Sequence, residues 1–154
     1  MKIARLVLCG AMAIATSAYA QKTCSAGDAA AAQKAVDKIV TWQSLEKAYH
    51  DYKHCDTGPV EDGFTDSMMR LMVGWKNVDA LAKAMDKDAD YKAFVYKHLM
   101  SDAAKDDRED VYALAKKQCP SGQSAFCEDL VSTVKPAKAE PLKPLNFDTI
   151  KPIK

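Results

Sequence analysis

Two histidines are the residues whose type and spacing could most directly do chemistry in this chain. His50 and His54 are four positions apart, and two imidazoles one helical turn apart can share an ion such as Zn²⁺, Cu²⁺ or Ni²⁺. We expect the adjacent Cys55 to be oxidised, so it cannot add a thiolate ligand. Hydrolytic zinc helices carry H-E-x-x-H, whereas Asp51 follows His50 here. The pair therefore supports a metal-binding hypothesis, without predicting a resident cofactor.

Two other motifs fail when their neighbouring residues are considered. The triplet Asp-Thr-Gly at 56–58 matches aspartic proteases, but it does not follow an apolar strand, and these residue types favour a turn. The aspartates at 86, 88 and 90 resemble the start of a calcium loop. That loop needs Gly at its sixth position and Glu at its twelfth, which are Tyr91 and Lys97 here. The sequence also lacks a G-x-S-x-G motif, a phosphate-binding glycine loop and a C-x-x-C pair.

A third histidine lies within the clearest helical pattern of the chain. Apolar residues and His98 follow Asp88 at helical spacing, and the set is Tyr91, Phe94, Val95, His98 and Leu99. The pattern predicts that His98 is a core or groove residue rather than a catalytic base. A deep pocket that held His98 beside a carboxylate would support an enzyme, which is the third functional hypothesis.

The N-terminus has the three parts of a bacterial-type secretory signal. Lys2 and Arg5 precede a short apolar run at 6–15, and the small-residue triplet Ala-Tyr-Ala ends at Ala20. The run is about half of the ~20 residues that a membrane-spanning helix needs. We therefore expect residues 1–20 to be a signal peptide cleaved after Ala20, which places the mature protein in the periplasm.

Four cysteines remain after that cleavage, and we expect them to form two disulfides in the oxidising compartment. They are Cys24, Cys55, Cys119 and Cys127. A single helix predicted over 29–53 would be about 38 Å long, which is too long for Cys24 to reach Cys55. Either that helix is broken, or the two cysteines are not paired. We favour long-range pairing, in which Cys24 and Cys55 each bond to Cys119 or Cys127.

Helical periodicity throughout predicts an all-α fold, a compact array of five or six short helices within one domain at 21–134. The expected helix starts are Asp28, Pro59, Asn77, Asp88, Asp106 or Asp107, and Ser121. A Pro/Lys-rich extension follows at 135–154, and we expect it to be an extended or disordered tail. Its apolar residues also allow a strap that lies on the domain or on a partner.

The distribution of charge argues against several partners. Removing Lys2 and Arg5 leaves 20 basic and 21 acidic residues, a net charge of −1. The tail contributes +3, from five lysines against Glu140 and Asp148, so the preceding domain is at −4. Nucleic acids and strongly anionic membranes need a basic face, so we expect neither as a partner. No later segment of the sequence is long and apolar enough to span a bilayer.

The order of several short motifs resembles a group of small exported helical proteins of Gram-negative bacteria that are mainly uncharacterised. The similarity covers roughly 42–130 and lies in Tyr49-x-x-Tyr52, Cys55-Asp56-x-Gly58, Glu61, Phe94-Val95-x-x-His98, Cys119-Pro120-x-Gly122 and Phe126-Cys127. It implies no catalytic residue. The format alone is similar to periplasmic immunity proteins, which are small, helical, disulfide-bonded and often dimeric, and it adds a homodimer to the expectations.

These observations lead to a first hypothesis of a non-catalytic periplasmic binding protein, an immunity protein or inhibitor that neutralises a toxin or a cell-wall hydrolase. Its expected contact residues are Asp56, Glu61 and Asp62, which form a polar turn beside an expected disulfide. The second hypothesis is a periplasmic metal-binding protein that uses His50 and His54. An enzyme of unknown type is the third.

Overall fold

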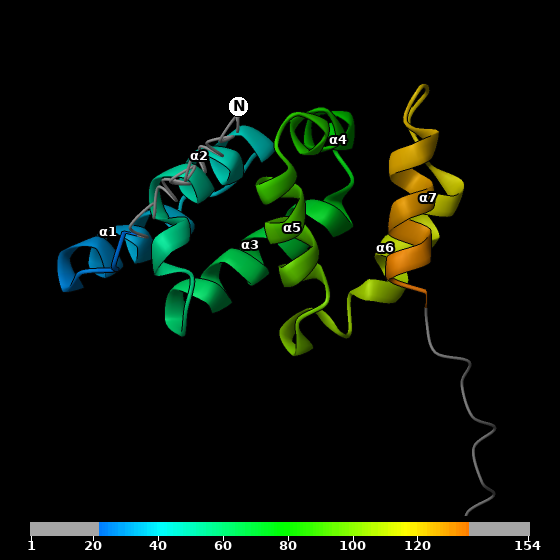
Figure 1. The fold of residues 1–154 in the computed structure, drawn as a ribbon. Coiled ribbons are helices and arrows are strands. Elements are labelled where there is room, and N and C mark those ends of the chain that lie inside the picture. The colour runs from blue at the N-terminus through cyan, green and yellow to red at the C-terminus, as the bar shows by residue number, and fades with distance from the viewer. Residues whose placement is uncertain (1–21, 136–154) are drawn as a thin grey trace, which may run out of the picture.

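The computed structural model describes residues 22–135, so the predicted signal peptide and the tail beyond Lys135 lie outside the described residues. Within this range the chain is all helical, as predicted (Figure 1). The α-helices are α1 (Ala26–Val36), α2 (Trp42–Tyr52), α3 (Pro59–Gly74), α4 (Val78–Lys87), α5 (Ala89–Leu99), α6 (Arg108–Lys117) and α7 (Ser124–Thr133). Two short 3-10 helices are η1 (Lys53–Cys55) and η2 (Asp102–Ala104). None of these described helices could cross a membrane.

The predicted helix over 29–53 is wrong, because the chain breaks between Val36 and Trp42. The β-branched run Ile39-Val40-Thr41 has low helix propensity, and Thr41 caps α2 instead. Its hydroxyl accepts from the Ser44 amide at 3.1 Å, while the Ser44 hydroxyl accepts from the Thr41 amide at 3.0 Å. This reciprocal capping box stops α1 from continuing into α2, so residues 22–135 form seven α-helices rather than five or six.

The break also overturns the predicted long-range disulfides. With α1 and α2 separate, Cys24 and Cys55 come together with a Cα–Cα distance of 4.9 Å and form a disulfide. Cys119 and Cys127 form the second, with a Cα–Cα distance of 6.0 Å. The predicted participation of all four cysteines is therefore confirmed, but their favoured pairing is wrong. Two disulfides suit an oxidising, extracytoplasmic compartment.

The predicted helix starts are partly confirmed. Pro59 is the first residue of α3, and the Asp88 carboxylate caps α5 by accepting from the Tyr91 amide at 3.0 Å. Asn77 and Asp107 precede α4 and α6 without a capping side-chain hydrogen bond. Two starts are wrong. Ser25 caps α1 in place of Asp28, and α7 begins at Ser124, after Ser121 and a left-handed Gly122.

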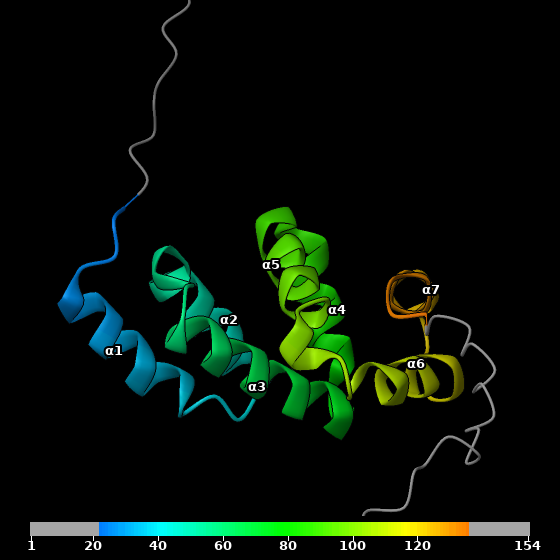
Figure 2. The ribbon, with the colours of Figure 1, turned by 90° about the horizontal axis from the view of Figure 1, so that it is seen from below.

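The elements follow one another across the molecule, with α3 as the shared support. Figures 1 and 2 show α1 and α2 at one end, α4 and α5 in the middle, and α6 and α7 at the other end. Helix α3 contacts α1, α2, α5 and α6. It supplies the fully buried Phe64, Met68 and Met72 to the core. The buried face predicted for α5 is confirmed, since Tyr91, Phe94, Val95, His98 and Leu99 are all buried.

Helices α6 and α7 form a hairpin closed by the Cys119–Cys127 disulfide. Polar contacts join it to the rest of the molecule, and two of them come from residues distant in the sequence. The Trp75 indole, at the end of α3, donates to the Gln118 carbonyl at 2.8 Å. Lys92 of α5 pairs with Asp129 of α7 at 2.7 Å.

Candidate functional site

A buried polar network joins α3, α5 and the turn between η1 and α3. His98, on α5, is 1% exposed and lies under the rings of Phe94 and Phe64. Its Nδ1 atom is 2.7 Å from Thr65 Oγ1 on α3, and its Nε2 atom is 3.2 Å from Asp56 Oδ2 in the turn. Both ring nitrogens of a core histidine are thus satisfied, as burial of a polar group requires.

Lys97 extends this network to the surface. Its ammonium is 2.9 Å from Asp56 Oδ2 and 2.8 Å from Glu61 Oε1. Burial on its own would raise the pKa of Asp56, but the hydrogen bonds from His98 and Lys97 and their charges outweigh it and lower that pKa. Burial would likewise lower the pKa of Lys97, yet its bonds to Glu61 and Asp56 raise it. Asp56 is therefore held as a carboxylate by two donors from α5.

The order of hydroxyl, imidazole and carboxylate resembles the arrangement that activates a nucleophile in hydrolases. Thr65 is 2% exposed, however, and its hydroxyl also reaches the Glu61 carbonyl at 3.0 Å. Five hollows within residues 22–135 are lined by other residues and do not include Thr65, His98 or Asp56. His98 does lie beside a carboxylate, but its side chain is buried and none of these five hollows reaches it. In this arrangement the three residues connect α3 to α5.

The network fixes the turn that leads into α3. Cys55 is held by the disulfide to Cys24, and Asp56 is held by His98 and Lys97. Gly58 has a φ of 55°, a left-handed conformation that glycine adopts without steric cost. Pro59 then occupies the first turn of α3, where its fixed φ is favourable. Thr57, Gly58 and Pro59 are nevertheless exposed, so the turn is both anchored and accessible.

The three predicted contact residues have different surroundings. The Asp56 carboxylate is only 9% exposed. Glu61 is 36% exposed and shares Lys97 with Asp56. Asp62 is exposed on the first turn of α3. The structure brings Asp56 and Glu61 together through Lys97, which the sequence analysis did not select. Of the three predicted contact residues, Asp62 is the one whose carboxylate is exposed and shares no ion pair within residues 22–135.

The two predicted metal ligands face different carboxylates. His50, on α2, lies 3.8 Å from Asp88 Oδ2, whereas His54 lies 3.6 Å from Asp28 Oδ2 on α1. His54 belongs to η1 rather than to the helix of His50, so the two do not share one α-helical face. No group of three or more His, Cys, Asp or Glu side chains within residues 22–135 is placed to hold a metal ion. The metal hypothesis stays a prediction, and calorimetry with Zn²⁺, Cu²⁺ and Ni²⁺ tests it.

Asp28, the residue nearest His54 Nε2, also accepts hydrogen bonds from two other side chains. Hydrogen bonds from the Ser25 hydroxyl and from Lys22 lower the pKa of Asp28 to about 2. The carboxylate therefore carries its charge at neutral pH beside the nearly buried His54, whose side chain is 10% exposed. This contact lies next to the Cys24–Cys55 disulfide, but His54 Nε2 is buried without a hydrogen bond to any described residue.

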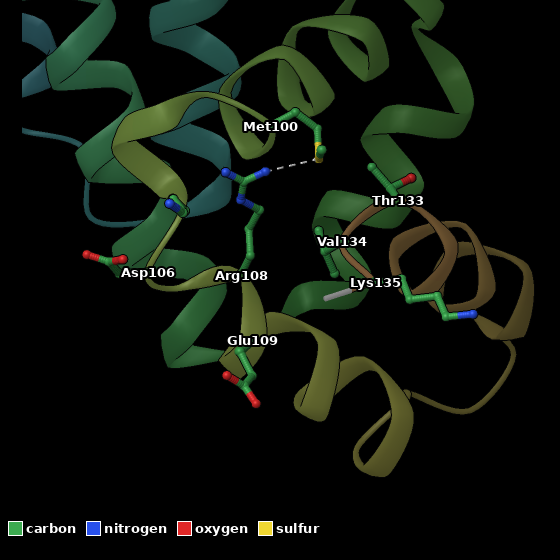
Figure 3. A pocket seen from close by; sticks show the side chains of 8 residues that line it. Met100, Asp106, Arg108, Glu109, Thr133, Val134 and Lys135 are labelled. Atoms are coloured by element: carbon green, nitrogen blue, oxygen red, sulfur yellow. Dashed lines mark hydrogen bonds between the residues drawn. The ribbon is translucent and has the colours of Figure 1, made fainter. Parts of the chain in front are cut away.

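A hollow of about 390 Å³ lies where α7 ends (Figure 3). Arg108 points across it toward Met100, with Nη1 3.8 Å from the methionine sulfur. Val134 and Lys135 line its other side. Met100 is 45% exposed, and the hollow mixes basic and acidic side chains, so it favours no ligand charge.

Comparisons with known proteins assign no relative to this fold. No family model matches the chain, and no curated protein or solved structure matches it either. The function therefore has to be argued from the residues and contacts of the chain itself.

Proposed function

We propose that this chain is an exported, non-catalytic binding protein of the periplasm, which inhibits a toxin or a cell-wall hydrolase. The contact surface is the turn 56–59 together with the first turn of α3. Inhibition would work by occlusion, with the exposed turn entering the active cleft of the partner. The single observation that carries this proposal is the anchoring of an exposed turn from several sides.

The anchoring matters because binding is weakened by the entropy lost when a loop becomes ordered. Here the Cys24–Cys55 disulfide holds the residue before the turn, and Asp56, the first residue of the turn, is bonded to His98 and Lys97 of α5. Glu61, just beyond it, is held by the same Lys97. A loop already fixed in the free protein loses little entropy on binding, which is the property expected of an inhibitory loop.

The predicted contact residues also have different roles in the proposed surface. Asp56 supports the turn from within, because its carboxylate is 9% exposed. The residues left for a partner are Thr57, Pro59 and Asp62, which are exposed. Asp66 is also exposed one helical turn after Asp62. An acidic edge of this kind would complement a partner whose cleft has a basic rim.

The test is an affinity pull-down with the chain from Gln21 to Lys154, from periplasmic extracts and from secreted toxins of competing bacteria. Captured proteins are identified by mass spectrometry. The double variant Thr57→Arg/Asp62→Arg changes the exposed part of the surface and leaves Asp56 in place. Asp86→Arg is the matched control, because Asp86 is an exposed aspartate of a different helix, α4.

We expect one hydrolase or toxin in near-equal amount with the parent chain and the Asp86 variant, and its loss with the double variant. Its activity should fall when the parent chain is added. Capture of the same partner by all three proteins would refute the turn as the contact surface. Capture without inhibition, or an empty pull-down from every extract, would refute the inhibitor proposal.

A further inference from the structure

The outer face of the α6/α7 hairpin carries an open groove of about 600 Å³. Its floor is apolar and consists of Tyr112 and Ala115 from α6, Val131 from α7, and the Cys119–Cys127 disulfide. Lys116 and Glu128 stand at its edges. Hollows of this size and apolar lining are typical of sites that bind an apolar group.

The position of Lys135 indicates which segment could occupy the groove. This residue is the last one described, and it lines both the groove and the hollow at the end of α7. The remaining 19 residues, 136–154, are therefore attached to the described chain at the edge of the groove. A segment that is tethered at the edge of its site has an effective concentration near the millimolar range, which a free partner would have to exceed.

The sequence of this segment fits an apolar groove. It contains four prolines, and its apolar residues are Leu142, Leu145, Phe147, Ile150 and Ile153. Leu142 and Leu145 are three positions apart, as are Phe147, Ile150 and Ile153. Three residues make one turn of a polyproline II helix, so in that conformation such residues would share a face. The segment from Lys135 onward also has a charge of +3 against −4 for the domain before it.

We propose that residues 142–153 of the same chain bind in the α6/α7 groove as a strap. The reach is sufficient, because the seven residues from Lys135 to Leu142 span up to about 22 Å in a proline-rich chain. Helix α7, with its ten residues, is about 15 Å long. The first apolar residues of the strap can therefore reach either end of the groove. The proposal is independent of the inhibitory turn, which lies at the other end of the molecule (Figure 1).

The test is photo-crosslinking of the chain from Gln21 to Lys154 with p-benzoylphenylalanine in place of Tyr112. A second protein carries the probe in place of Lys116, which is exposed, in case the first substitution disturbs packing. A third carries it in place of Tyr52 on α2, away from the groove. Cross-linked peptides are mapped by mass spectrometry at low protein concentration. Each groove-probe protein is also made with Leu145→Asp/Phe147→Asp, and with Asn146→Asp/Thr149→Asp as a control of equal charge.

We expect the probes at 112 and 116 to cross-link within one chain to residues 142–153, and the probe at 52 to give no such product. The Leu145/Phe147 variant should lose the product and the control should retain it. Cross-links that join two copies would overturn the proposal in favour of a dimer contact. Absence of tail cross-links from both groove positions, or equal yields in the two charge variants, would also overturn it.

Discussion

The hydroxyl oxygen of Thr65 lies 2.7 Å from Nδ1 of His98, across the contact between α3 and α5. The Thr65 hydroxyl has one proton to donate. Its oxygen lies within hydrogen-bond distance of two acceptors, His98 Nδ1 and the Glu61 carbonyl at 3.0 Å. If the proton points to Glu61, His98 donates from both ring nitrogens. If it points to His98, the imidazole is neutral and donates only to Asp56. In both arrangements every polar atom of the Thr65–His98 pair has a partner.

Replacing Thr65 with Val tests this contact, because Val keeps the shape of the side chain and removes the hydroxyl. His98 Nδ1 would then be buried without a partner, which costs about 1–3 kcal/mol. Chemical denaturation at pH 7 should show that loss in the free energy of unfolding. Thr65→Ser is the control, since it restores the hydroxyl and should recover most of the stability. Equal stability of the Val and Ser variants would mean that the hydroxyl contributes nothing.

The Asp56 carboxylate should make stability depend on pH in the acidic range. Its pKa in the folded chain lies below the ordinary value of 3.8, so folding favours the ionised form. The stabilisation is therefore complete well above pH 3.8 and is lost as the pH falls through the lower folded pKa. We expect Asp56→Asn to cost about 1.5–3 kcal/mol at pH 7, as for a hydrogen bond to a charged group.

Urea denaturation at pH 7 and at pH 3 measures this effect. The difference in the free energy of unfolding between the parent chain and Asp56→Asn should be smaller at pH 3. Other carboxylates also titrate in this range, but they do so equally in both proteins and cancel from the difference. Asp62→Asn is the control, because Asp62 is exposed on the first turn of α3 and its replacement should change stability little at either pH. A difference that stays constant between the two pH values would contradict the ion pairs of Asp56.

Local signals in the sequence were enough to predict several parts of this fold. Pro59 and Asp88 start helices, and the apolar spacing from Tyr91 to Leu99 placed His98 in the core. The partners of His98 could not be predicted, because Thr65 and Asp56 are 33 and 42 positions away. Lys97 was missed for the same reason, because its partners Asp56 and Glu61 lie in the turn before α3 and in α3, far from it in the sequence.

The break after Val36 was missed because apolar spacing continues through it. Ile39 is fully buried, so it fits the helical pattern although it lies in a turn. Contacts from α3 satisfy the carbonyl groups that the break releases. The Ser67 hydroxyl donates to the Val36 carbonyl at 3.0 Å, and Arg70 donates to the Ile39 carbonyl at 3.1 Å. The local signals were the β-branched run at 39–41 and Thr41 followed by Ser44, a capping box with Ser where Glu or Gln is usual.

The two disulfides should stabilise the fold unequally. Cys24 and Cys55 are 31 positions apart, whereas Cys119 and Cys127 are 8 apart. The chain-entropy relation gives about 3.7 kcal/mol for the longer loop and about 2.6 kcal/mol for the shorter one. Cys24→Ser/Cys55→Ser should therefore lower the free energy of unfolding by about 1 kcal/mol more than Cys119→Ser/Cys127→Ser does. A non-reducing peptide map of the parent chain checks the two disulfides on which this prediction depends. Any other pairing of the four cysteines would contradict it.

Close packing between α1 and α3 leads to a prediction at Gly63. A Cβ atom added there would lie 2.6 Å from Cγ2 of Val36, so Gly63→Ala forces the two helices apart. Overpacking of this kind costs about 1–3 kcal/mol, which exceeds the ordinary helix preference of Ala over Gly.

Gly74 is the matched control at the other end of the same helix, where an added Cβ meets nothing within 4 Å. Gly74→Ala should leave stability unchanged or raise it by about 0.4–1 kcal/mol, because Ala reduces the freedom of the unfolded chain. Thermal and urea denaturation of both variants give the comparison. The double variant Gly63→Ala/Val36→Ala should recover part of the loss, since it removes the Cγ2 atom that the new methyl group meets. If Gly63→Ala were as stable as Gly74→Ala, α1 and α3 would not approach as closely as the fold requires.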